Sequence, residues 1–66
     1  MKINVKIIWD SEACVWIATS TDVPGLVTES ETIEELTKKL KIMIPELLEI
    51  NKPHMNYRNF EIIIQS

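Results

Sequence analysis

The chain of 66 residues has the length of one small domain, residues 1–66, and leaves no room for a second. Its content of 45% apolar and 26% charged residues is that of a folded globular protein and excludes a disordered chain. Ten acidic residues against seven basic ones give a net charge of −3, which argues against nucleic acid as a partner, since phosphate contacts favour a basic surplus.

No targeting or membrane segment is expected. Residues 2–10 alternate between polar and apolar side chains, unlike the apolar stretch of a signal peptide. No apolar run approaches the ~20 residues that a membrane span needs. Cys14 is the only cysteine, so an internal disulfide is excluded, and a lone reduced thiol fits the cytoplasm. The sequence therefore predicts a cytoplasmic protein without a membrane segment.

Two alternating segments, residues 2–9 and 13–20, predict a β-hairpin with one apolar face. The register that aligns their apolar rows pairs Trp9 with Cys14, Ile7 with Trp16 and Val5 with Ala18. The turn at Ser11 and Glu12 lacks the Asn-Gly or Asp-Gly dipeptide of a tight hairpin, so a longer or irregular loop is the alternative.

The strongest turn signal is the segment Asp-Val-Pro-Gly at residues 22–25. Pro24 suits the second position of a β-turn, and Gly25, the only glycine, tolerates the positive φ of the third position. Residues 26–28 are then expected to pair as a short third strand.

Residues 33–50 have the apolar spacing of one long helix. Thr32 and Glu35 form a capping box at its start. A single apolar stripe follows, made of Ile33, Leu36, Leu40, Met43, Ile44, Leu47 and Leu48. Pro45 lacks the amide that would bond the carbonyl of Lys41, so a kink or a break is expected there. Because the stripe continues in phase through Pro45, one kinked helix is favoured over two shorter helices.

The last element is a strand over residues 60–65, which follows a polar connection. A third strand that is antiparallel to the second runs parallel to the first, and a crossover through the helix brings the last strand beside the first in the same direction. The predicted fold class is therefore α+β. It consists of a three-strand antiparallel meander, one long Pro-kinked helix on one face, and a fourth strand parallel to the first.

The sequence offers no residues for catalysis, for a cofactor or for a metal. It contains no P-loop, no dinucleotide-binding glycine motif and no paired cysteines. Cys14 belongs to the row expected to face the helix, where a thiol serves as a small apolar side chain. His54 is the only histidine and is expected on the surface, since no companion ligands exist for a metal. The chain is predicted not to be an enzyme.

Two groups of side chains bear on a nucleic-acid role. Trp9 and Trp16 share the face expected to meet the helix, which favours a core role over a base-stacking platform. The basic residues that lie closest together are Lys38, Lys39 and Lys41. Glutamates four residues before two of them indicate a solvated helix face in place of a phosphate-binding patch. Nucleic-acid binding is therefore not expected.

Apolar side chains also occur on the sheet face that a single helix leaves uncovered. They are Ile8, Val15, Ile17 and Ile63, with Val15 expected to face Ile8 directly. Monomers seldom leave such patches open, so these four residues are predicted to form a partner interface, with a homodimer as the expected assembly, formed through this face or through an exposed strand edge. The alternative is that β-branched residues are present only because they are good strand formers.

Five segments carry a family pattern. They read Trp-Asp at 9–10, Glu-Ala-x-Val-Trp-x-Ala-Thr-Ser at 12–20, Asp-Val-Pro-Gly-Leu-Val-Thr-Glu at 22–29, Glu-Thr-Ile-Glu-Glu-Leu at 31–36 and Met-Ile-Pro-Glu-Leu-Leu at 43–48. Together they resemble the HicB-like antitoxin superfamily, most closely its small stand-alone branch, whose function is largely uncharacterised. The resemblance spans nearly the whole chain and implies a truncated ribonuclease-H-like fold without catalytic activity.

The resemblance also implies a partner. HicB antitoxins bind a small basic ribonuclease toxin and block its active site, and the acidic balance of this chain suits such a toxin. Full HicB antitoxins usually carry a C-terminal DNA-binding segment, whereas this sequence stops at Ser66, so no DNA-binding domain is expected. Two other roles stay open: a stand-alone regulatory homo-oligomer, and an RNA-binding or RNA-processing module. The latter requires Arg58 and the three helix lysines on one accessible face.

Overall fold

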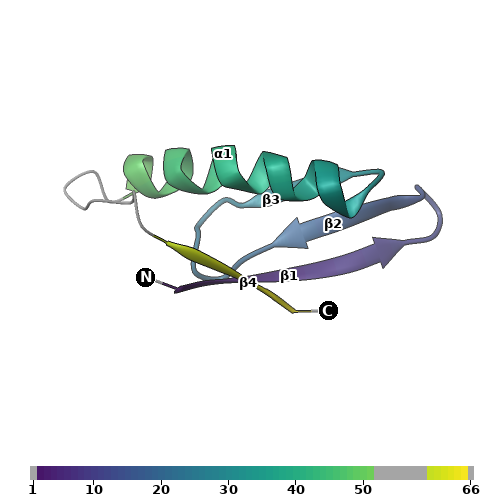
Figure 1. Ribbon diagram of the computed structural model, residues 1–66, viewed down its shortest axis with the longest axis horizontal. Coiled ribbons are helices and arrows are strands. Elements are labelled where there is room, and N and C mark those ends of the chain that lie inside the picture. Colours follow the sequence, from purple (N-terminus) through teal and green to yellow (C-terminus); the bar gives the residue numbers. More distant parts are fainter. Residues whose placement is uncertain (1, 52–59, 66) are drawn as a thin grey trace.

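The strands and the helix follow one another in the order β-β-β-α-β (Figure 1). The structure is a computed structural model that describes residues 2–51 and 60–65. Within these residues the elements are β1 (Lys2–Asp10), β2 (Val15–Thr19), β3 (Val27–Ser30), α1 (Ile33–Asn51) and β4 (Glu61–Gln65). The strand order in the sheet is β3-β2-β1-β4; β1 and β4 are parallel and the other neighbours antiparallel. The helix lies along one face, which confirms the predicted fold class.

The register of the first hairpin differs from the prediction by two residues. Trp9 lies opposite Trp16 instead of Cys14, and Ile7 lies opposite Ala18. The predicted assignment of side chains to the two faces of the sheet is still correct, because a shift by an even number of residues keeps every side chain on its side of the sheet. The predicted register is nevertheless wrong, and the longer loop is the form that the chain adopts.

The cause of the shift is the turn at residues 11–14. One oxygen of Asp10, Oδ1, accepts hydrogen bonds from the backbone amides of Glu12 at 3.0 Å and Ala13 at 3.3 Å. These bonds satisfy the turn amides locally, as Asp side chains commonly do. Cys14 then closes the loop with a positive φ of 56°. Its side chain is exposed, and Sγ lies 3.6 Å from the carbonyl oxygen of Ser11, so the prediction of a buried thiol facing the helix is wrong.

The second turn confirms the prediction from Pro24 and Gly25. The amide of Leu26 donates to the carbonyl of Val23 at 3.1 Å, which places the proline and the glycine at the two central positions. Gly25 has a φ of 85°. The strand that follows begins one residue later than predicted, because Leu26 turns into the core with an exposed fraction of 2%.

The helix begins at Ile33 with one of the two bonds of the predicted capping box. The hydroxyl of Thr32 accepts from the amide of Glu35 at 3.2 Å, and its carbonyl accepts from the amide of Leu36 at 3.1 Å. The helix continues through Pro45 to Asn51, which confirms the single helix over two shorter ones. At its end, Nδ2 of Asn51 donates to the carbonyl of Leu47 at 2.8 Å.

The core lies between α1 and the sheet. Its fully buried side chains come from β1, β2, the second turn and one helix stripe with four-residue spacing: Ile3, Val5, Ile7, Ala18, Val23, Leu26, Leu36, Leu40, Ile44 and Leu48. Full burial of a leucine or isoleucine side chain contributes about 1.5–3 kcal/mol. Trp16 packs against this cluster, whereas Trp9 is 45% exposed, so the prediction that both rings belong to the core is only half right.

Candidate functional site

The described residues show no site for metal chemistry. Among residues 2–51 and 60–65, no group of three or more histidine, cysteine, aspartate or glutamate side chains lies close enough together to hold a metal ion. No helix in this part of the chain has the length and apolar character needed to cross a membrane. His54 and Arg58, which entered the sequence-based arguments, lie outside the described residues.

The face of the sheet away from α1 carries an apolar cluster. Ile8 of β1 lies directly opposite Ile17 of β2 and is 49% exposed, while Ile17 is half-buried. Val15 lies two residues along β2 on the same face, but opposite Asp10, so the prediction that it faces Ile8 is wrong. These three apolar residues, Ile8, Val15 and Ile17, are called the outer cluster below.

Ile63 does not join the outer cluster. It lies opposite Asn4, four residues along β1 from Ile8. The intervening row across the sheet is polar and contains Thr19, Lys6 and Gln65. Of the four residues predicted to form one interface, the structure thus brings three together and places the fourth on a separate part of the same face.

Val27 is an apolar residue of this face that the sequence did not reveal. It pairs with Thr19, so both point away from the helix, and it is 67% exposed. Its side of the sheet depends on how β3 pairs with β2, which the short segment 26–28 could not indicate. Glu29 of the same strand lies opposite Ile17 and brings a carboxylate to the border of the outer cluster.

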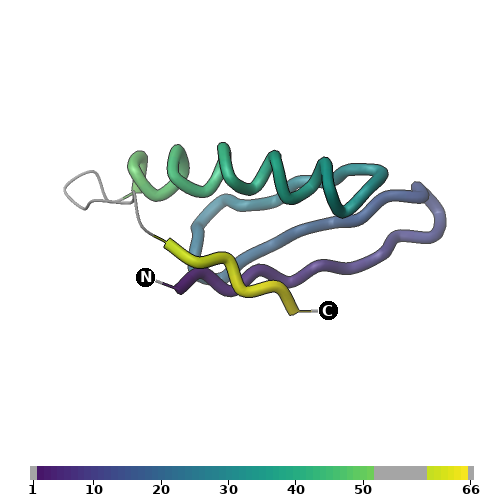
Figure 2. Tube along the Cα trace, viewed as in Figure 1, coloured from purple at the N-terminus to yellow at the C-terminus, as the bar shows by residue number. Residues whose placement is uncertain are grey.

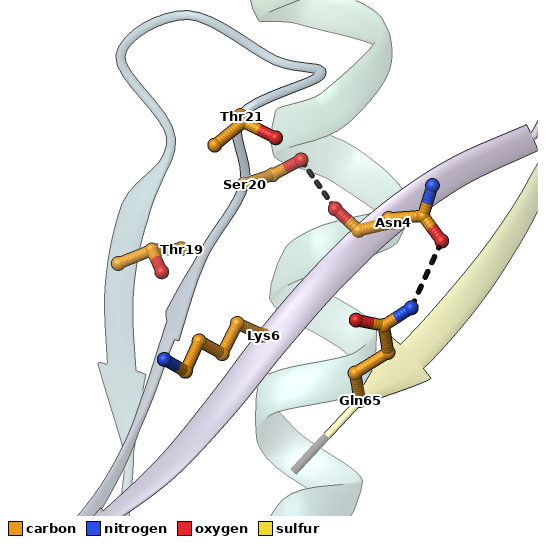
Figure 3. Close-up of a pocket in the computed structure, with 6 residues that line it drawn as sticks. All are labelled: Asn4, Lys6, Thr19, Ser20, Thr21 and Gln65. Carbon is orange, nitrogen blue, oxygen red and sulfur yellow. Dashed lines mark hydrogen bonds between the residues drawn. The ribbon is translucent and has the colours of Figure 1, made fainter.

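A polar hollow of about 300 Å³ adjoins the outer cluster. Figure 3 shows the residues that line it: Asn4, Lys6, Thr19, Ser20, Thr21 and Gln65. Ser20 Oγ donates to the carbonyl of Asn4, and Gln65 Nε2 donates to Asn4 Oδ1 at 3.4 Å (Figure 3). Asp22 Oδ2 accepts from the backbone amide of Asn4 at 2.8 Å. These bonds join the ends of β1, β2 and β4, which gives the hollow a structural role.

The two tryptophans form a cross-strand pair at the hairpin end of the sheet. The ring centroids of Trp9 and Trp16 lie 5.0 Å apart at an interplanar angle of 55°, a tilted arrangement that aromatic pairs favour. Both rings are on the helix side, since their strand positions alternate with the outer cluster. The pair therefore supports the hairpin and leaves only part of Trp9 accessible.

The helix lysines do not act as one free basic patch. Lys39 Nζ donates to the backbone carbonyl of Glu29 in β3 at 2.6 Å, a contact that the sequence did not predict. Lys38 and Lys41 are exposed. Near the other end of the helix, Glu46, Glu49 and Ile50 are the described residues that line a second hollow of about 300 Å³.

The family follows from a comparison with known proteins. Residues 2–65 match the model of a family described as a domain of unknown function, DUF1902. The chain belongs to the DUF1902 family. A solved structure of similar sequence is the crystal structure of hypothetical protein TTHA1013 from the extremely thermophilic bacterium Thermus thermophilus. It is 46% identical, with coverage of 98% of this chain and 90% of that chain and a TM-score of 0.87. No curated protein matches this DUF1902 chain.

Proposed function

We propose that this DUF1902 protein is a non-enzymatic binding protein of HicB-like type, an antitoxin-like partner of a small basic ribonuclease toxin. The observation that carries the proposal is the outer cluster. Ile8 and Ile17 are apolar residues on the face that α1 leaves uncovered, and carboxylates of Asp10 and Glu29 lie at their border. An apolar centre with charged groups at its rim is the usual composition of a protein interface.

The sign of the charge supports a basic partner. The chain carries a net charge of −3, and Asp10 and Glu29 flank the outer cluster on two sides, with Lys6 on a third. Complementary charges at the rim increase the association rate and disfavour partners of the wrong sign. The resemblance to HicB-like antitoxins, which bind basic toxins, supports the same class of partner. An RNA-binding role receives less support, since Lys39 bonds to the backbone of β3.

The proposal is tested by co-expression with the product of any adjacent small basic reading frame. We expect the wild-type chain to restore growth and to co-purify with that product. Ile17→Asp should abolish both effects, because it places a charge at the centre of the outer cluster. Ile42→Asp is the matched control, since Ile42 is 62% exposed on the helix, and it should leave binding unchanged.

Three results would contradict the proposal. The first is a complex that survives Ile17→Asp, which would place the interface elsewhere. The second is ribonuclease activity in the purified protein, and the third is tight, salt-sensitive RNA binding. Either of the last two results would favour the RNA-processing alternative. For RNA binding, a strong dependence of the affinity on salt concentration is the signature of phosphate contacts.

A further inference from the structure

The sheet has two edges, formed by β3 and β4. An edge strand presents backbone N–H and C=O groups that no neighbouring strand pairs, and it is a template for another strand unless the protein protects it. The two edges of this sheet differ in that protection.

The β3 edge is short and covered. β3 has four residues, and α1 packs against it and against β2. Lys39 Nζ from the helix donates to the carbonyl of Glu29 at 2.6 Å and so occupies one of the acceptors of this strand. A lysine at a strand edge is a common means of preventing further pairing.

Among the residues that the structure describes, 2–51 and 60–65, none protects the β4 edge in this way. Its five residues, Glu61–Gln65, contain three consecutive isoleucines and neither lysine nor proline. Ile64 is 47% exposed, and Ile62 and Ile63 are only partly buried. Figures 1 and 2 show β4 beside β1, while α1 lies above β3 and β2. Such an apolar, open edge strand is unusual in a protein that stays monomeric.

The sequence of β4 is nearly the same in both directions, which identifies the occupant as a second copy of the chain. We infer that β4 pairs with β4 of a second copy, antiparallel and centred on Ile63, so that two sheets join into one. In this register Ile63 faces Ile63 of the second copy, Ile62 faces Ile64, and Glu61 faces Gln65. Isoleucines therefore meet isoleucines on both faces, and the two glutamates lie at opposite ends of the pair.

The proposed pairing extends the core of each copy. Ile62 and Ile64 lie opposite the buried Ile3 and Val5 of β1, on the helix side of the sheet. Pairing across the two-fold axis would cover the exposed part of Ile64 with Ile62 of the second copy. A shift by one residue would move the isoleucines of one strand to the opposite face, and a shift by two would place Ile63 opposite Glu61 or Gln65, so the centred register keeps the most isoleucine pairs.

The dimer goes beyond the proposed function and does not depend on it. The outer cluster lies on β1 and β2, two strands that keep their positions in the joined sheet. It therefore stays accessible to a basic partner. Failure of toxin binding would leave the dimer intact, and loss of the dimer would leave the outer cluster in place.

Charge substitutions at the symmetry axis test the pairing without cysteine chemistry. Sedimentation of the full chain at tens of micromolar should show a dimer. Ile63→Lys and Ile63→Glu should each give monomers, because like charges then face each other across the axis. An equal mixture of the two variants should recover a dimer, a result that a folding defect would not give. Ile42→Lys, on the exposed side of the helix, is the matched control and should stay dimeric.

Single cysteines test the register. In a Cys14→Asn background, which leaves no other thiol, Ile63→Cys should form a disulfide-linked dimer under oxidation. Directly opposed residues of antiparallel strands have Cα atoms about 4.5–5.5 Å apart, within the range that a disulfide spans. Glu61→Cys and Gln65→Cys should each stay uncrosslinked alone and crosslink when mixed. A monomeric wild-type chain, or a dimer that crosslinks through Ile8→Cys and not through Ile63→Cys, would overturn the inference.

Discussion

Ile8 and Ile17 lie directly opposite each other on adjacent strands, on the face of the sheet that α1 does not cover. Their neighbours in sequence, Ile7 and Ala18, also lie opposite each other but face the helix and are buried. One pair of strands thus carries two apolar rows with different surroundings. The row under the helix stabilises the fold, and the row on the open face is available for binding.

The first prediction separates these two rows by stability. Ile17→Asp should lower the free energy of unfolding by about 1–2 kcal/mol, because it removes the cross-strand pair with Ile8 and places a carboxylate opposite Glu29. Leu40→Ala should lower it by about 2–5 kcal/mol, since it leaves a cavity in the core. Urea titration followed by circular dichroism measures both changes. An Ile17→Asp protein that is unfolded without denaturant would show that the outer cluster belongs to the core.

The second prediction concerns the left-handed residue of the first turn. Cys14 has a φ of 56°, a conformation that costs a residue other than glycine or asparagine roughly 1–2 kcal/mol. Cys14→Gly should raise the free energy of unfolding by about 1 kcal/mol, somewhat reduced by the greater freedom of glycine in the unfolded chain.

Ala13→Gly is the matched control for the turn. Ala13 is not among the residues with positive φ, so this change adds freedom to the unfolded chain without relieving strain. It should lower stability. Thermal unfolding monitored by circular dichroism compares the two variants, and equal losses in both would contradict the role of the positive φ.

Much of the fold could be predicted because local signals agree with the tertiary arrangement. Alternation over residues 2–7 marked β1, the proline and glycine marked the second turn, and Thr32 with the apolar stripe marked the helix. The hairpin register could not be obtained in this way. It depends on the carboxylate of Asp10 capping the turn and on a left-handed Cys14, neither of which changes the alternation of the flanking strands.

The residues of the candidate surface could be predicted only in part. Alternation assigned Ile8, Val15 and Ile17 correctly to the open face, because the face depends on parity alone. The register between strands decides which of these residues become neighbours. It places Ile63 opposite Asn4, apart from the outer cluster, and it brings Val27 to the open face. The open edge of β4 became apparent only when the position of the helix over β2 and β3 was known.

The third prediction concerns the tryptophan pair. Trp16→Ala should lower the free energy of unfolding by about 3 kcal/mol, because this ring packs against the core. Trp9→Ala should cost at least about 1 kcal/mol less, since almost half of its surface is already exposed. The double variant should reveal a coupling of about 0.5–1.5 kcal/mol between the rings. Additive losses in the double-mutant cycle would mean that the ring contact contributes nothing beyond burial.

The last prediction concerns Pro45 within α1. Proline in a helix interior removes one backbone hydrogen bond, here the one to the carbonyl of Lys41, and costs about 3 kcal/mol. Pro45→Ala restores the amide, while the greater freedom of the unfolded chain opposes this gain by about 1 kcal/mol. The net expectation is a rise of about 2 kcal/mol in the free energy of unfolding, measured by urea titration. Glu46→Ala, the next helix position, is the control and should change stability by less than about 0.5 kcal/mol, as exposed substitutions usually do. A loss of stability in Pro45→Ala would instead show that the packing of the half-buried proline ring outweighs the missing hydrogen bond.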